Sequence, residues 1–126
     1  MHIHWVLKLP DLRRDGDHVH RDAESFRALL ETCGDAKQAR LHEKWNALDF
    51  RRQMAIVVMH TYGNTGHDHA ITSVWKTDRE ILVVVARRHP AHGAKVFLSF
   101  THPTSGVAIN RSDLPVRFIW ICKSRL

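Results

Sequence analysis

Apolar residues recur along most of the chain in short runs with the two-residue period of β-strands. Residues 2–9 and 70–75 alternate between apolar and polar positions, whereas 54–59 and 81–86 are continuously apolar. Alternation predicts strands with one buried face, and continuous apolar runs predict strands that are covered on both faces. Seven strands are predicted, at residues 2–9, 54–59, 70–75, 81–86, 95–100, 107–109 and 116–122. The last of these also carries apolar residues on both faces and is predicted to be covered on both.

One segment has the period of a helix instead. Phe26, Leu29, Leu30 and Cys33 fall at positions i, i+3, i+4 and i+7, which places them on one face of a helix over residues 22–33. Asp22 is suited to cap its first turn, and the following glycine is suited to end it. Residues 36–44 are compatible with a further short helical piece, and residues 11–17 are predicted to form a charged turn.

These elements predict an α+β fold that is mainly β: an antiparallel sandwich or partly open barrel of about seven strands with one N-terminal helix. The 126 residues are 44% hydrophobic and 25% charged, which is ordinary for one globular domain, so residues 1–126 are predicted to be a single domain. No apolar run reaches the roughly 18 residues of a membrane helix, and the first residues do not resemble a secretory signal. A cytoplasmic location is the default expectation, and the compartment stays open.

The formal charge of +6 favours an anionic partner, such as an acidic protein face or a nucleic acid. The basic residues are dispersed in pairs, of which Arg87 and Arg88 are one example. Nucleic-acid binding would need exposed aromatic side chains beside these residues, and the strand aromatics are interpreted as core. A basic nucleic-acid-binding domain is therefore kept as an alternative to a protein-binding module.

Eleven histidines raise the question of metal binding. Residues i and i+2 of a strand point to the same side, so a His-x-His pair could direct two imidazoles toward one metal ion. Three such pairs occur: His2 with His4, His18 with His20, and His67 with His69. No HExxH motif or paired cysteines accompany them, so no metal and no other cofactor is predicted. A small histidine metal-binding protein remains an alternative, with His67 and His69 as the candidate ligands. Cys33 and Cys122 are interpreted as small buried hydrophobes, and no enzymatic activity is predicted.

Two loops are the predicted partner-binding region, because loops held by rigid strands commonly carry function. The first covers residues 62–69 and the second covers 88–93. Tyr62 is predicted to be an aromatic anchor, and the arginines to favour an acidic partner. The predicted contact residues are Tyr62, Asn64, Thr65, Gly66, His67, Asp68, Arg87, Arg88 and His89.

The middle of the chain resembles a known family. The run 48–54, the apolar strand at 55–59, Gly63 and the Thr65-Gly66 pair are similar to the Asp-Phe turn, strand, glycine and Thr-Gly loop of the PrcB-like domain family. The later strands, Pro90, Pro103 and the segment 116–118 follow the same order, so that the resemblance spans about residues 18–120. In the family the Thr-Gly pair is usually followed by glycine and an aromatic residue, whereas His67 and Asp68 stand here.

The resemblance implies a β-rich, non-catalytic, protease-associated domain that stabilises or inhibits a protease or protease complex. The short run Asn64-Thr65-Gly66 also faintly resembles a loop of chagasin-type cysteine-protease inhibitors. A likeness of fold does not by itself establish function, so the partner is an expectation only.

Overall fold

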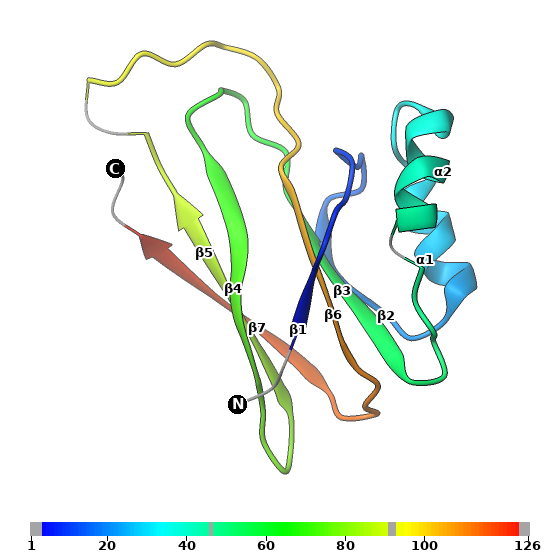
Figure 1. Cartoon of the computed structure of the whole chain (residues 1–126). Coiled ribbons are helices and arrows are strands. Elements are labelled where there is room, and N and C mark those ends of the chain that lie inside the picture. The colour runs from blue at the N-terminus through cyan, green and yellow to red at the C-terminus, as the bar shows by residue number, and fades with distance from the viewer. Residues whose placement is uncertain (1–3, 46, 91–92, 124–126) are drawn as a thin grey trace.

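Two β-sheets and a pair of helices form three layers in the computed structural model (Figure 1). The structure describes residues 4–45, 47–90 and 93–123. The prediction for His2 and part of the predicted loop 88–93 therefore lie outside the described residues. The elements are β1 (His4–Leu7), β2 (Gly16–His20), α1 (Ala23–Leu30), α2 (Ala36–Trp45), β3 (Gln53–Met59), β4 (Asp68–Lys76), β5 (Ile81–Arg88), β6 (Thr104–Asn110) and β7 (Val116–Lys123). No helix among these is long and apolar enough to cross a membrane.

The strands form one four-stranded and one three-stranded sheet. The first has the order β1-β6-β3-β2 and is antiparallel throughout, and the second has the order β4-β5-β7. β4 and β5 form a hairpin, whereas β5 and β7 run parallel. The parallel pair arises because the chain leaves β5, crosses to the first sheet as β6, and returns to the second sheet at the end where β5 began. The mainly β sandwich is confirmed, with this one parallel pair inside it.

β3 separates two hydrophobic cores because both of its faces are buried. Ala55, Val57 and Met59 contact the core beneath the helices, which includes Phe26 and Leu29. The alternate residues Met54, Ile56 and Val58 contact the core between the two sheets. The continuous apolar run of β3 thus has the two-sided cover that its sequence predicts.

The helical layer is anchored where the sequence predicts its start. The Asp22 carboxylate accepts a hydrogen bond from the Ser25 backbone N–H at 2.7 Å, as an N-cap does. α1 ends at Leu30, earlier than predicted, and a tighter turn follows in which the Cys33 N–H donates to the Leu30 carbonyl. The short helical piece is a full second helix, so the fold has two helices instead of one.

Three predictions about strands are wrong. Residues 16–20, expected partly as a turn, form β2 because each of them pairs with a residue of β3. Residues 95–100 form no strand, and their side chains are exposed. The predicted two-sided cover is absent from β5 and β7, since Leu82 and Val84 on the outer face of β5 are only half-buried and Ile121 on that of β7 is exposed. Apolar pattern alone does not show which segment finds a neighbouring strand or layer.

Candidate functional site

At one end of the space between the sheets, the inward row of the second sheet changes from apolar to polar. His69 lies opposite Arg87, and Arg87 lies opposite Cys122. Two residues further into the sheet, the same face carries Val85 beside Trp120. Side chains from the first sheet and its loops complete a cluster that we call the polar end: Asp17, His60, Tyr62, His67, His69, Arg87, His89, Trp120 and Cys122.

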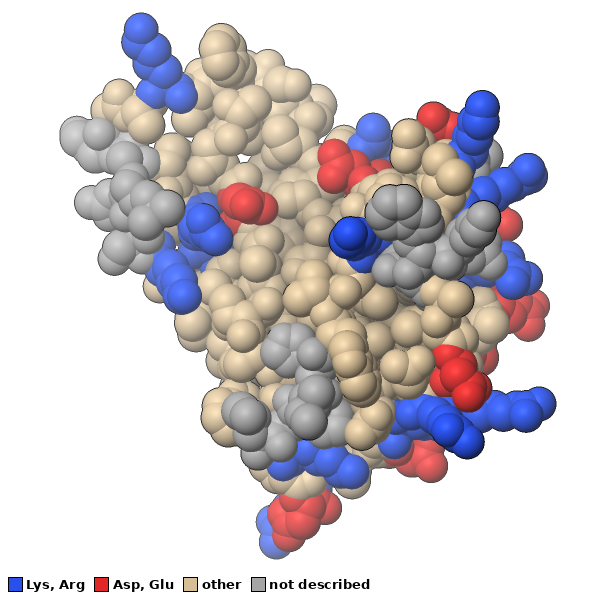
Figure 2. Space-filling view, in the orientation of Figure 1, with Lys and Arg blue, Asp and Glu red and all other residues tan. Residues whose placement is uncertain are grey.

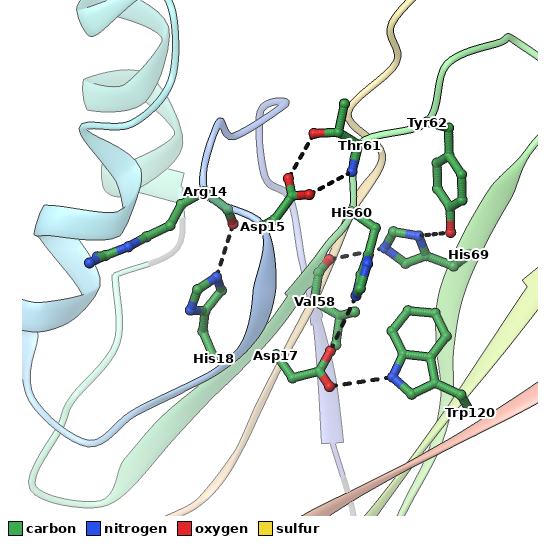
Figure 3. A network of polar contacts seen from close by, with 10 residues as sticks. All are labelled: Arg14, Asp15, Asp17, His18, Val58, His60, Thr61, Tyr62, His69 and Trp120. Carbon is green, nitrogen blue, oxygen red and sulfur yellow. Dashed lines mark hydrogen bonds and ion pairs between the residues drawn. The ribbon is translucent and has the colours of Figure 1, made fainter.

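Asp17 links the two sheets within the polar end (Figure 3). It lies opposite Val58 in the β2–β3 ladder, and its side chain therefore faces the second sheet. Its Oδ2 accepts a hydrogen bond from Trp120 Nε1 at 3.3 Å, and its Oδ1 is 3.7 Å from His60 Nε2. The His60 ring also meets the indole edge-on, with the ring centres 4.8 Å apart. One carboxylate thus organises an indole and an imidazole from different layers.

His69 is a structural residue of the polar end. Its Nε2 is 3.1 Å from the Val58 carbonyl oxygen and its Nδ1 is 3.2 Å from the Tyr62 hydroxyl (Figure 3). Burial lowers the pKa of His69, although the hydrogen bond to Val58 opposes this. Both ring nitrogens are occupied, so His69 cannot serve as a metal ligand in this arrangement. Among the described residues, no group of three or more His, Cys, Asp or Glu side chains could hold a metal ion.

Tyr62, the predicted anchor, already has partners inside the molecule. Its ring stacks on His67, with centres 5.4 Å apart and planes 12° apart. The Arg87 guanidinium lies 6.0 Å from the centre of the same ring. Burial raises the pKa of the Tyr62 hydroxyl. Removing this side chain would therefore disturb the polar end as well as any partner contact.

The loop before Tyr62 is tied to the start of β2. The Asp15 carboxylate accepts hydrogen bonds from the Thr61 hydroxyl at 2.7 Å and from the Thr61 N–H at 3.4 Å (Figure 3). These bonds lower the pKa of Asp15. His102 Nδ1 is 3.1 Å from the same hydroxyl, so Thr61 connects the segment before β2 with the segment before β6.

The predicted loop 62–69 is paired with a segment distant in sequence. Tyr62 and Thr101 exchange two backbone hydrogen bonds of 2.9 Å. The Thr65 N–H donates to the Phe97 carbonyl at 3.1 Å, and the Phe97 N–H donates to the Thr65 hydroxyl at 2.9 Å. Asn64 accepts the Gly66 N–H within the loop, at 3.0 Å. Asn64, Thr65 and Gly66 therefore position residues 96–101.

Residues 96–100, which we call the apolar lip, present apolar side chains to solvent. Phe97 is 76% exposed, Leu98 93% and Phe100 77%. In Figure 1 this segment runs in yellow and orange over the top of the loop that precedes β4. A Cβ atom at Gly66 would lie only 2.5 Å from Val96 Cγ1, so the lip packs closely against the loop through its first residue.

Several charged groups belong to the lip's own segment and to the ends of β4 and β5. Lys95, which directly precedes the lip, and Arg88 are exposed, whereas Arg87 is half-buried with its guanidinium 5.2 Å from the Trp120 ring centre. Asp68 is exposed and accepts the His69 N–H at 2.8 Å. Figure 2 shows uncharged side chains over much of the upper part of this face, with single acidic and basic groups among them.

His67 and His89 face each other with their Nδ1 atoms 3.1 Å apart. Of the nine predicted contact residues, Tyr62, His67, Arg87 and His89 belong to the polar end, and Asn64, Thr65 and Gly66 support the lip. Asp68 and Arg88 are exposed and lie opposite each other in the β4–β5 ladder. Sequence reasoning missed four members of the polar end, Asp17, His60, Trp120 and Cys122, as well as the lip itself. A signal for the lip was the run Val96-Phe97-Leu98, which is apolar on consecutive positions and not on alternate ones. Cys122 was expected to be buried but is exposed, Cys33 is half-buried, and both are free thiols.

Comparison of the chain with protein-family models, curated proteins and solved structures found no match.

Proposed function

We propose that this chain is a non-catalytic protein-binding module that contacts its partner through the apolar lip. The observation that carries the proposal is the exposure of Phe97, Leu98 and Phe100 on a segment held by backbone hydrogen bonds. A contiguous exposed apolar patch is the common mark of an interaction site, and aromatic residues are enriched at interfaces.

The lip is suited to binding because its backbone is already ordered. Phe97 is tied to Thr65, and Thr101 is tied to Tyr62, on either side of the most exposed residue. Ordering a free segment would cost binding free energy, and a preformed one avoids much of that cost. The loop that sequence analysis assigned to the partner thereby acts as the support of the contact segment.

The partner that fits this surface is a protein with an apolar patch bordered by acidic groups. Lys95 directly precedes the lip and is exposed, and the chain carries a formal charge of +6. Complementary charge at the rim would mainly accelerate association. The sequence resemblance to PrcB-like domains supports a protease or protease complex as the first candidate, with a stabilising or inhibitory role.

The test replaces the lip side chains without touching the backbone bonds, in the triple variant Phe97→Ser, Leu98→Ser, Phe100→Ser. A matched control is Val6→Ser with Leu41→Ser, which removes exposed apolar groups elsewhere. Proteins captured by the wild type and the control but lost with the triple variant are titrated as purified partners. We expect the triple variant to bind at least about tenfold more weakly, with an unchanged melting temperature.

Three results would overturn the proposal. The first is unchanged affinity of the triple variant for every captured protein, and the second is a collapse of its stability, which would make the lip structural. The third is a concentration-dependent dimer, seen by sedimentation, that the triple variant abolishes, because a second copy would then cover the lip. Fluorescence anisotropy with oligonucleotides tests the alternative, which requires binding that weakens steeply as salt rises.

A further inference from the structure

Cys122 differs from the other cysteine in the features that govern thiol reactivity. It is exposed near the end of β7, and its Sγ lies 3.8 Å from His89 Nε2. Cys33 is half-buried and packs against the core beneath the helices. Reactive thiols sit in accessible, electropositive settings, whereas thiols against apolar cores are inert.

His89 is oriented to accept the thiol proton. Its Nδ1 is 3.1 Å from His67 Nδ1, and the two rings meet edge to face with centres 5.1 Å apart. When His89 carries its proton on Nδ1 and donates to His67, its Nε2 is the free acceptor that faces Cys122. The same bond then stabilises the imidazolium that forms once His89 takes the proton. His67 is in turn held in place by stacking on Tyr62.

A cationic residue is paired with Cys122. Arg87 is its direct neighbour across the β5–β7 ladder, whereas Arg88 and Lys123 are paired one position further along and face the other side of the sheet. The Nε of Arg87 is buried and has no hydrogen-bond partner among the described residues. Its guanidinium contacts the ring of Trp120. A positive charge beside the sulfur attracts anionic reagents.

We propose that Cys122 is a thiol modification site that forms a mixed disulfide with small anionic disulfides. The thiol proton passes to His89 Nε2, and the thiolate attacks one sulfur of the reagent. A new S–S bond forms, the old one breaks, and the leaving thiolate departs with the electron pair. A free thiol in solution reverses the modification by the same exchange. The site is independent of the proposed contact through the lip.

The experiment measures reaction with 5,5′-dithiobis(2-nitrobenzoic acid), a dianionic disulfide whose leaving group is coloured. In the Cys33→Ser background, Cys122 is the remaining cysteine. Near neutral pH we expect it to react at least about tenfold faster in the folded protein than in the same chain in urea, with the adduct mapped to Cys122. His89→Gln should remove most of this gain, whereas His42→Gln on α2, whose ring contacts the Lys8 carbonyl, should leave the rate unchanged.

A neutral disulfide, 2-hydroxyethyl disulfide, keeps the proposal testable if His89→Gln fails to fold. Arg87→Gln should slow the anionic reagent more than the neutral one, because the charge acts on the reagent. The proposal is overturned if folded Cys122 reacts no faster than the unfolded chain. It is also overturned if folded His89→Gln reacts at the parent rate, or if Arg87→Gln slows both reagents equally or neither.

Discussion

The indole Nε1 of Trp120 donates a hydrogen bond of 3.3 Å to the carboxylate of Asp17, a residue 103 positions away on the opposite sheet. The bond connects β2 with β7 at the end of the sandwich where the apolar core gives way to histidines. Because neither strand pairs with the other, this contact depends entirely on how the two sheets are stacked. It is therefore a direct probe of the tertiary arrangement.

A double-mutant cycle of Asp17→Ala and Trp120→Phe should show a coupling free energy of about 0.5–1.5 kcal/mol, as expected for one hydrogen bond. Urea unfolding of the four proteins measures it. Both variants that lack Asp17 also lose its contact with His60, and so this loss cancels from the coupling free energy. The control is Trp75→Phe, whose indole donates to Ser73 on its own strand, and its coupling with Asp17 should be zero. Equal couplings for both tryptophans would contradict the stacking described here.

Gly66 should be required for seating the apolar lip. A Cβ atom there would lie 2.5 Å from Val96 Cγ1 and 2.7 Å from Pro90 Cβ, so Gly66→Ala should destabilise the fold by about 1–3 kcal/mol. Gly63→Ala in the same loop is the matched control, since a Cβ atom there meets nothing within 4 Å. Thermal unfolding followed by circular dichroism compares the two. Equal melting temperatures would show that the loop and the lip are not packed together.

The helices should contribute to stability as a true core layer. Leu29 is fully buried whereas Leu98 on the lip is 93% exposed, and truncation to alanine removes the same atoms at both. Leu29→Ala should lower the free energy of unfolding by about 2–5 kcal/mol, and Leu98→Ala should change it by less than about 0.5 kcal/mol. Urea unfolding gives both values. A small loss for Leu29 would mean that the helices do not cover the first sheet in solution.

Stability should fall as the pH falls from about 6.5 to about 4, because His20 is buried against Phe26. Burial, and next the neighbouring His18, lower the pKa of His20 from 6.5 to about 4. In this range the unfolded chain binds the proton that the folded chain excludes, so the contribution is present above pH 6.5 and lost below it. The shift corresponds to on the order of 3 kcal/mol.

His20→Leu should flatten this dependence, and the Ser25 hydroxyl, which loses its partner at 3.0 Å, can still donate to the Asp22 carbonyl. Urea unfolding at pH 7, 5 and 4 is the measurement, and His42→Gln is the control that should keep the parent slope. Burial also lowers the pKa of His69, so part of the acid sensitivity should remain. An unchanged slope for His20→Leu would show that His20 is accessible to protons in the fold.

Secondary structure was predictable where a segment's own pattern decides it. The buried run of β3 and the cap of α1 at Asp22 depend on residues close in sequence, and both were predicted correctly. β2 was missed because its polar sequence gains strand structure only by pairing with β3. Residues 95–100 have a strand-like composition but are bonded to the neighbouring loop only through Phe97 with Thr65, and just beyond them Thr101 pairs with Tyr62.

For the candidate site, the loops were predicted but their roles were not. The sequence by itself determined a β-rich chain with a two-sided central strand, because side-chain period and burial are linked locally. Only the tertiary structure decided that Asp17 meets Trp120, that His89 meets Cys122, and that the residues of the lip stay outside the core. These outcomes depend on which sheet each strand joins and on how the two sheets stack, and contacts across such separations leave no periodic signal in the chain.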